Sequence, residues 1–172
     1  MSKIAYADPP YLGCSSFYPE HEEVDHDKLI ETLCWEYEYW ALSCSSPSLG
    51  HLLNHYLLRD RDVIRVAAWV KPFASFKPNV NPGYAWEPVI YKPREHRTRG
   101  EPTVRDWQAA SITLKKGLVG AKPAKFCFWL FDLLGAQPDD EFYDLFPGTG
   151  VVTRCWDSWR DQQRCSQIAL LK

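Results

Sequence analysis

The stretch FYDLFPGTG, residues 142–150, indicates how the chain is built. Its first half predicts a strand, and residues 151–162, which follow the glycines, have the pattern of a helix. Gly148 and Gly150 permit a tight turn and a close approach of the backbone to a ligand, and the helix offers free N–H groups at its start. Asp144, ahead of the glycines, can accept hydrogen bonds from an amine or a ribose hydroxyl. A Gly-rich connection between strand and helix also occurs without any ligand, so this motif alone leaves both interpretations open.

A second motif, Asp8-Pro9-Pro10-Tyr11, follows the apolar run of residues 3–7, which predicts a buried strand. The prolines stiffen the turn and remove two N–H donors, so the Asp8 carboxylate and nearby carbonyls form a fixed set of acceptors. Such acceptors suit a base amino group, because accepting both of its hydrogens frees the nitrogen lone pair. The Tyr11 ring can stack on a base, an interaction worth roughly 1–3 kcal/mol. An ordinary strand-ending turn is the alternative interpretation of these four residues.

Predicted strands alternate with predicted helices along the chain, which indicates an α/β fold with a largely parallel sheet. The 172 residues suit one domain, residues 1–172, with a sizeable core. Further strands are expected at residues 39–44, 63–70, 87–91 and 167–171. Further helices are expected at residues 28–39, with Asp25 or Asp27 as the cap, at 49–58, and at 123–134, with Gly135 at the end.

The charges are unevenly distributed along the chain, although the net charge is only −2. Residues 1–60 carry a net charge of −7, and residues 92–125 carry a net charge of +6. A nucleic acid would be attracted to the second region and repelled by the first. A merely solvated loop is the alternative for the basic region. The residues expected to contact phosphates are Lys92, Arg94, Arg97, Arg99, Arg105, Lys115 and Lys116.

The cysteines and the apolar runs bear on metal binding and location. The six cysteines form no C-x-x-C pair, and no histidines cluster beside them at zinc-ligand spacing, so no metal site is expected. The N-terminal residues lack an apolar signal core, and no apolar run approaches the length of a membrane span. These features favour a cytoplasmic protein with reduced thiols that mostly pack in the core.

Together the two motifs resemble those of the DNA amino-methyltransferases, which methylate the exocyclic amino group of adenine or cytosine. The catalytic motif of that family is D/N/S-P-P-Y/F/W, and its cofactor motif is of the D-x-F-x-G-x-G type. In this chain the catalytic motif comes first and the cofactor motif last, which resembles the circularly permuted order of the beta class. Further similar segments are AWVKP at 68–72, WEPVIYKP at 86–93 and GAKP at 120–123.

The resemblance implies a Rossmann-like methyltransferase sheet and S-adenosylmethionine (SAM) as the cofactor. It assigns Asp8, Pro9, Pro10 and Tyr11 to catalysis. The implied reaction moves a methyl group directly to a base amino group in DNA, with adenine preferred over cytosine. It implies no metal and no covalent enzyme intermediate. The cofactor-binding residues that it implies are Asp144, Phe146, Pro147, Gly148, Thr149, Gly150 and Lys122.

The resemblance covers about residues 5–152, and the chain departs from the family pattern both after them and at residues 92–120. The expected strand at 167–171 has no acidic residue for the ribose hydroxyls, and the sheet is expected to be truncated after it. Residues 92–120 form a short basic insert in place of a target-recognition region. A homodimer or a partner subunit would then complete the cofactor or recognition surface. The alternatives are a non-catalytic nucleic-acid-binding or scaffold subunit of the same fold, and a methyltransferase acting on RNA or a nucleotide.

Overall fold

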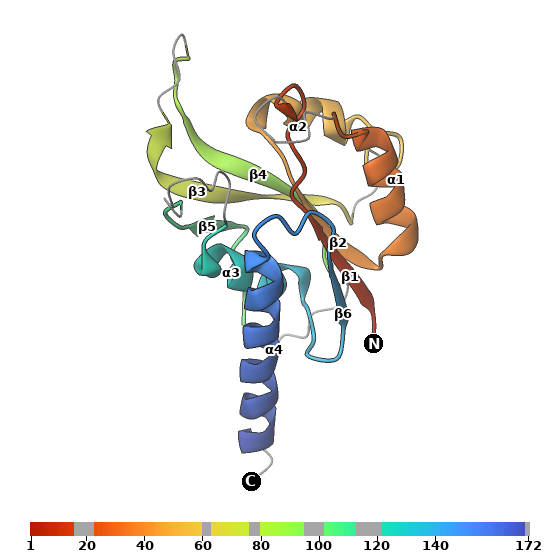
Figure 1. The fold of residues 1–172 in the computed structure, drawn as a ribbon, viewed down its shortest axis with the longest axis vertical. Coiled ribbons are helices and arrows are strands. Elements are labelled where there is room, and N and C mark those ends of the chain that lie inside the picture. The colour runs from red at the N-terminus through yellow and green to blue at the C-terminus, as the bar shows by residue number, and fades with distance from the viewer. Residues whose placement is uncertain (16–22, 60–62, 76–79, 95–101, 113–121, 171–172) are drawn as a thin grey trace.

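The described residues form a mixed sheet of six strands, in the order β5-β3-β4-β2-β1-β6 (Figure 1). The structure is a computed structural model that describes residues 1–15, 23–59, 63–75, 80–94, 102–112 and 122–170. The strands are β1 (Lys3–Ala7), β2 (Tyr39–Ser43), β3 (Arg65–Ser75), β4 (Tyr84–Lys92), β5 (Trp107–Ala109) and β6 (Glu141–Asp144). The helices are α1 (His26–Glu36), α2 (Ser46–Leu53), α3 (Ala124–Leu134) and α4 (Val151–Leu170).

Three of the five strand pairings in this sheet are parallel, which makes the sheet mixed. β1 lies between β2 and β6 and is parallel to both, and β5 is parallel to β3. β4 runs antiparallel to β2 and to β3, because the short connection from Ser75 to Tyr84 returns the chain beside β3. The carboxyl ends of β1, β2, β3 and β6 therefore meet at one edge of the sheet, which we call the carboxyl edge.

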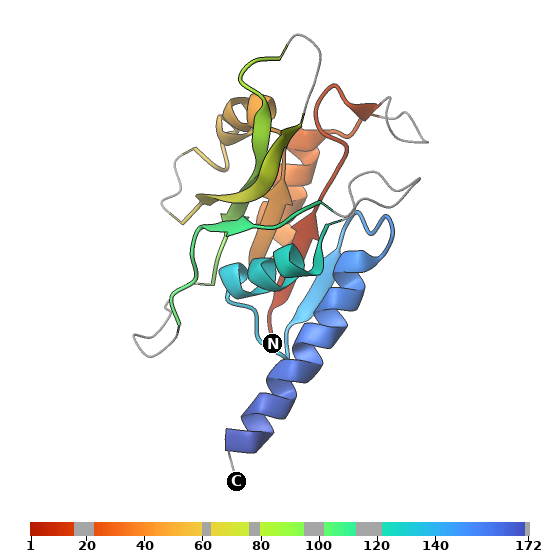
Figure 2. The same cartoon turned by 90° about the vertical axis from the view of Figure 1, so that its left-hand side faces the viewer.

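Helices cover both faces of the sheet, as Figure 2 shows, with α3 and α4 on one face and α1 and α2 on the other. Side chains of β1 alternate between the two layers. Ile4 and Tyr6 pack with residues of α3 and α4, whereas Ala5 and Ala7 pack with residues of α1 and α2. All four side chains are fully buried, so β1, the strand that leads into the first motif, is fixed from both sides.

Capping side chains explain where the first two helices begin. Asp25 accepts a hydrogen bond from the Lys28 N–H, so α1 starts at His26, and it ends at Glu36 rather than at residue 39. Ser45 accepts from the Ser48 N–H in the same way, so α2 starts ahead of the predicted residue 49 and ends well before residue 58. The strand β5 lies within residues 92–120, where no strand is predicted, and it extends the sheet beside β3.

The strand predicted at residues 167–171 is wrong, because α4 continues to Leu170. Residues 151–170 contain neither glycine nor proline, so nothing in the sequence interrupts the helical hydrogen bonds. An apolar run forms a strand only where a neighbouring strand pairs with it, whereas a helix propagates through local bonds. In Figure 1, α4 extends past the end of the sheet. Within the described part of the chain, no helix is both long enough and apolar enough to cross a membrane.

Two glycines associated with helices provide a matched test of backbone conformation. Gly135 ends α3 in the left-handed conformation, with a φ of 70°. Gly50 lies within α2 and has nothing within 4 Å of an added Cβ. We expect Gly135→Ala to lower the free energy of unfolding by about 1 kcal/mol and Gly50→Ala to raise it by about 0.5–1 kcal/mol. Urea denaturation measures both changes, and a Gly135→Ala variant as stable as the wild type would contradict this assignment of the cap.

Candidate active site

The carboxyl edge of the sheet brings the two sequence motifs side by side. β1 and β6 are adjacent and in register, with Tyr6 opposite Asp144. The Leu145 N–H donates to the Tyr6 carbonyl at 2.9 Å, so the pairing continues just beyond β6. Asp8 is the first residue after β1. The turn that begins at Asp8 and the glycine loop that follows Asp144 therefore leave the sheet from neighbouring positions.

The loop after β6 has the conformation that its glycines allow. Gly148 has a φ of 46° and Gly150 a φ of 68°, in the left-handed region that other residues rarely adopt. A Cβ atom at position 150 would lie 3.1 Å from Nη1 of Arg154, which donates to the Thr149 carbonyl at 3.0 Å. The Gly150 N–H donates to the Pro147 carbonyl at 2.6 Å, and α4 begins at the next residue. The loop is thus a tight turn that presents the start of a helix.

Asp144 is the acidic residue ahead of this loop, and only one of its two carboxylate oxygens has a hydrogen-bond partner among the described residues. Its Oδ2 atom accepts a hydrogen bond from the Thr153 hydroxyl at 3.0 Å. Its Oδ1 atom is buried and has no hydrogen-bond partner among the described residues. Burial raises the pKa of this carboxyl group, and the negative charge of Asp8 raises it further, whereas hydrogen bonding by the Thr153 hydroxyl and by the backbone of Phe146 and Thr153 lowers it. Because a buried oxygen without a partner is costly, a ligand with an N–H or O–H donor would be stabilised here.

Asp8 forms an ion pair with Lys122 at the start of the first motif. Lys122 Nζ donates to Asp8 Oδ2 at 2.6 Å, and the two side chains are 4% and 21% exposed, respectively. Burial raises the pKa of Asp8, and the charge and hydrogen bond of Lys122 oppose that increase. Lys122 reaches Asp8 because it lies just before Pro123, where α3 begins on the same face of the sheet. Lys122, which the family resemblance assigns to the cofactor, thus lies against the first motif.

Side chains from β3 and β4 complete this site, and the two sequence motifs do not identify them. Glu87 accepts a hydrogen bond from the Tyr11 hydroxyl at 2.9 Å through Oε2 and pairs with Lys71 through Oε1. Its Oε2 atom also lies 3.9 Å from Lys122 Nζ. The ring centroid of Trp69 lies 5.2 Å from the Lys71 ammonium and 5.4 Å from that of Lys122, within cation–π range. The sequence signal for Lys71 and Glu87 is that they lie in the similar segments AWVKP at 68–72 and WEPVIYKP at 86–93, to which no role is assigned from the sequence.

We call Asp8, Tyr11, Lys71, Glu87 and Lys122 the Asp8 cluster. It contains two carboxylates and two ammonium groups, so their charges balance. Burial raises the pKa of Glu87, but Lys122, Lys71 and the Tyr11 hydroxyl together lower it more, and Glu87 stays ionised. Burial raises the pKa of Tyr11 well above its ordinary value, so the hydroxyl stays protonated and can donate. The cluster therefore holds an ionised acceptor and an oriented aromatic ring at one edge of the sheet.

The remaining residues of the two motifs lie where the sequence predicts, around these two turns. Pro9 is buried and Pro10 half-buried after β1. Phe146 is half-buried, and Pro147 and Thr149 are exposed, in the glycine loop. The predicted catalytic and cofactor-binding residues therefore all lie at or close to the carboxyl edge.

The structure does not bring the predicted basic residues to the Asp8 cluster. Lys92 ends β4 at the opposite edge of the sheet. Arg94 pairs there with Asp140 at 2.5 Å, so it has a role in packing. Arg105 is exposed, with its guanidinium carbon 5.6 Å from the ring centroid of Trp107. The other four predicted phosphate contacts lie outside the described residues: Arg97, Arg99, Lys115 and Lys116.

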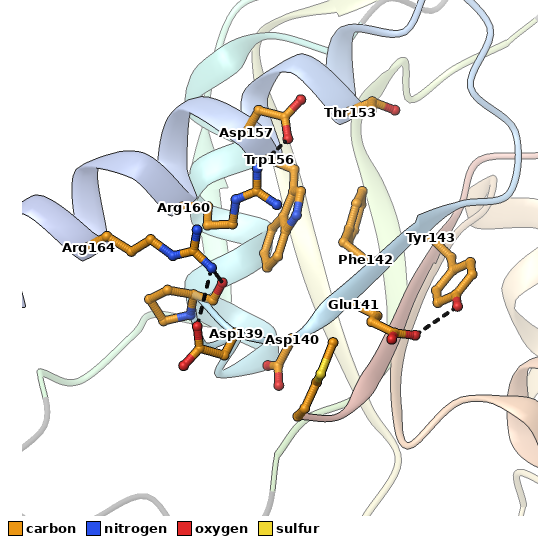
Figure 3. Close-up of a pocket in the computed structure, with 12 residues that line it drawn as sticks. Asp139, Asp140, Glu141, Phe142, Tyr143, Thr153, Trp156, Asp157, Arg160 and Arg164 are labelled. Atoms are coloured by element: carbon orange, nitrogen blue, oxygen red, sulfur yellow. Dashed lines mark hydrogen bonds and ion pairs between the residues drawn. The ribbon is translucent and has the colours of Figure 1, made fainter.

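A groove of about 620 Å³ runs along β6 and α4, away from the Asp8 cluster (Figure 3). Thr153 and Met1 are among the residues that line this groove, together with the aromatic residues Phe142 and Trp156. No member of the Asp8 cluster lines this groove, so we do not assign it to the catalytic centre. Among the residues that the structure describes, no three His, Cys, Asp or Glu side chains are grouped so as to hold a metal ion. The charged residues of the groove are Asp139, Asp140, Glu141, Asp157, Arg160 and Arg164.

A six-stranded mixed sheet with helices on both faces and two loops at its carboxyl edge corresponds to the methyltransferase fold. The chain is similar to the crystal structure of the M1.HpyAVI–SAM complex, with a TM-score of 0.58 and 14% identity over 92% of this chain and 78% of that chain. It is also similar to the crystal structure of M1.HpyAVI, with a TM-score of 0.54 and 14% identity over 92% of this chain and 76% of that chain. No family model and no curated relative matches the sequence.

Proposed function

We propose that this protein transfers a methyl group from S-adenosylmethionine to the exocyclic amino group of a nucleobase in DNA, with adenine preferred over cytosine. The observation that carries the proposal is that the Asp8 turn and the Asp144 loop follow adjacent, paired strands of a methyltransferase fold. An acceptor-rich turn beside a glycine loop suits a base and a cofactor held next to each other. The fold shared with M1.HpyAVI, whose structure has been solved with SAM, supports the choice of cofactor.

In this proposal Asp8, Pro9 and Tyr11 bind the target base. Lys122 engages Oδ2 of Asp8, and we assign Oδ1, together with the Pro9 carbonyl, to the two hydrogens of the amino group. Accepting both hydrogens favours a pyramidal nitrogen whose lone pair is free to attack. The Tyr11 ring stacks on the base, which helps to offset the cost of a few kcal/mol for flipping it out of a duplex. Positioning by these residues then supplies most of the rate.

The residues around Asp144 fit the cofactor. The buried Oδ1 atom of Asp144 can accept a hydrogen bond from an amine or a ribose hydroxyl. Gly148 and Gly150 leave the loop backbone open to close approach, and the first N–H groups of α4 follow directly. Phe146 is half-buried beside them and offers an apolar contact. When bound, S-adenosylmethionine supplies an electrophilic methyl group on a sulfonium centre.

Replacement of Asp144 by alanine is expected to weaken SAM binding by about 10- to 100-fold. The loss of a charge-assisted hydrogen bond costs about 1.5–3 kcal/mol, and each 1.4 kcal/mol is about tenfold in affinity. Calorimetric titration with SAM measures the change. Asp157→Ala is the matched control, because this carboxylate lies close by on α4, one turn beyond Thr153, but is 57% exposed and pairs with Arg160. Equal affinities for the wild type and Asp144→Ala would contradict the proposed cofactor site.

The proposed reaction is tested by incubating the full chain with SAM and DNA of mixed sequence, followed by mass spectrometry of the nucleosides. Methylation of the adenine amino group is the expected product. Methylation of the cytosine amino group alone would change the assigned base. SAM binding without any methylated nucleoside would favour the non-catalytic alternative, and methylation of RNA alone would move the substrate to RNA.

Two further points stay predictions. One is that the basic residues contact DNA, and the other is that a second copy of the chain or a partner subunit completes the site. Among the predicted phosphate contacts that the structure describes, Arg105 is exposed, just before β5 and beside the exposed ring of Trp107. If such residues contact phosphates, DNA affinity falls steeply as salt rises, and Arg105→Ala reduces that salt dependence. A recognition segment as short as residues 92–120 can bury little surface, which favours weak sequence selectivity.

A further inference from the structure

Glu87 is a charged residue of β4 that directly precedes the buried part of this strand, residues 88–91. Its side chain is 18% exposed, and Val89 and Ile90, further along β4, are fully buried. A buried ion pair seldom stabilises a fold more than apolar side chains of similar volume would. Stability therefore does not account for a carboxylate at this position, and its contacts indicate another role.

The first contact of Glu87 fixes the ring of Tyr11. Tyr11 lies on the turn after Pro10, beyond the end of β1, so no strand pairing holds it. Its hydroxyl donates to Glu87 Oε2 at 2.9 Å, and its carbonyl accepts from the Cys14 N–H at 2.8 Å. The side chain is thus held at its tip and the backbone at its base. Both bonds restrict the plane in which the ring can stack.

The second contact couples Glu87 to Asp8. Lys122 Nζ lies 2.6 Å from Asp8 Oδ2 and 3.9 Å from Glu87 Oε2, so one buried ammonium group lies between two carboxylates. Lys71 pairs with the other oxygen of Glu87 and prevents that carboxylate from rotating freely. The stacking ring and the acceptor carboxylate of the first motif are therefore both connected to one side chain of β4.

We propose that Glu87 is a positioning residue for methyl transfer, acting on the base through Tyr11 and, together with Lys122, through Asp8. This inference rests on the proposed function, because positioning has a measurable effect only if a base is methylated. In this role Glu87 contacts neither the base nor the cofactor. It sets the placement of the stacking ring relative to the carboxylate that accepts the amino hydrogens.

The two charges nearest to Asp8 have opposite effects on its titration. Burial raises the pKa of Asp8, Lys122 lowers it, and Glu87 raises it. Removing the charge of Lys122 should therefore raise the pKa of Asp8, and removing the charge of Glu87 should lower it. Opposite shifts would show that both charges act on Asp8 itself, whereas a loss of stability alone would leave the pH dependence of the folded enzyme unchanged. The other titratable groups that interact with Asp8, unchanged in both variants, are Lys71, Tyr6, Tyr11 and Asp144.

The test compares the pH dependence of kcat/KM for DNA in the wild type, Glu87→Gln and Lys122→Gln. Glutamine at position 87 keeps an oxygen for the Tyr11 hydroxyl and removes the charge. On the acid side of the profile, kcat/KM falls as Asp8 becomes protonated, and we call this part the acid limb. We expect the acid limb to move to lower pH in Glu87→Gln and to higher pH in Lys122→Gln, by about one pH unit each. Glu141→Gln is the matched control, because Glu141 also accepts a tyrosine hydroxyl, that of Tyr143 at 3.0 Å, but is exposed on β6. Its acid limb should coincide with that of the wild type.

Tyr11→Phe tests the positioning of the ring without changing any charge. Loss of the hydroxyl should lower kcat/KM for DNA about tenfold and leave SAM affinity unchanged. If Glu87→Gln or Lys122→Gln fails to fold, the kcat/KM of Tyr11→Phe still tests whether the ring has to be positioned. Two results would overturn the positioning role, provided that the wild type is active. One is that the folded Glu87→Gln and Lys122→Gln variants have the same pH dependence at acid pH as the wild type. The other is that Tyr11→Phe has the kcat/KM of the wild type. A wild-type protein that binds SAM but methylates no base overturns the proposed function instead.

Discussion

Replacement of Asp8 by alanine is expected to lower the rate constant for methyl transfer by about a thousandfold. The side chain supplies one of the acceptors proposed for the amino group, and its charge balances that of Lys122 at 2.6 Å. Without Asp8, the amino nitrogen keeps its lone pair delocalised in the ring, and Lys122 loses its nearest carboxylate and keeps Glu87 Oε2 at 3.9 Å. A single-turnover assay with labelled SAM measures this rate constant without a contribution from product release.

Asp8→Asn is the matched control, because an asparagine oxygen still accepts one hydrogen at the same place. We expect transfer by this variant to stay within about tenfold of the wild type at neutral pH. Burial raises the pKa of Asp8, so the wild type should lose activity on acidification at a pH nearer neutrality than an ordinary aspartate would. The asparagine variant has no proton to gain and should lack that loss. Equal rates in the wild type and Asp8→Ala would contradict the assigned role.

Thermal unfolding has to accompany these rates, because Asp8 also affects the fold. Lys122 is 4% exposed and would be left without its closest counter-charge in Asp8→Ala. Breaking a buried pair costs on the order of 3 kcal/mol, and the 21% exposure of Asp8 reduces that value. A loss of transfer in protein that is still folded separates the chemical effect from the structural one.

The sequence predicts correctly those elements that local signals determine. Residues 3–7 are an apolar run that forms β1, and Pro9 and Pro10, one residue beyond its end, stop the strand. α3 ends where Gly135 can adopt a left-handed conformation that other residues avoid. The glycine loop before α4 is likewise encoded by Gly148 and Gly150. In each of these elements the deciding residue lies within or next to the segment that it shapes.

Prediction from the sequence fails where a distant partner decides. The segment 167–170 has the residues of a strand but continues α4, because whether a strand forms depends on pairing elsewhere in the chain. The Asp8 cluster shows the same limit, since Tyr11 and Glu87 are 76 residues apart and Asp8 and Lys122 are 114 apart. Motifs identify the turn, but only the sheet order brings β4 and the start of α3 beside it.

Trp156→Ala is expected to lower the free energy of unfolding by about 3–5 kcal/mol. The indole ring is 4% exposed and stacks on Phe142 and Trp159, with ring centroids 5.0 Å and 5.2 Å away. Phe131 of α3 meets it edge-on at 5.2 Å. The replacement removes this buried area and leaves a cavity that rigid rings cannot fill, and each lost aromatic pair adds about 0.5–1.5 kcal/mol. Urea denaturation measures the change.

Replacement of Trp156 should also weaken SAM binding at the candidate site, because the stacked rings around Trp156 pack α4 against β6 and α3. α4 begins directly after Gly150, and Thr153 of the same helix donates to Asp144 at 3.0 Å. We therefore expect the variant to bind SAM more weakly in calorimetric titration as well as to unfold at lower urea. Trp35→Ala is the matched control, because this indole is 69% exposed on α1 and its removal should change stability by less than about 0.5 kcal/mol. If the two tryptophan variants proved equally stable, α4 could not be anchored to the sheet by this stack.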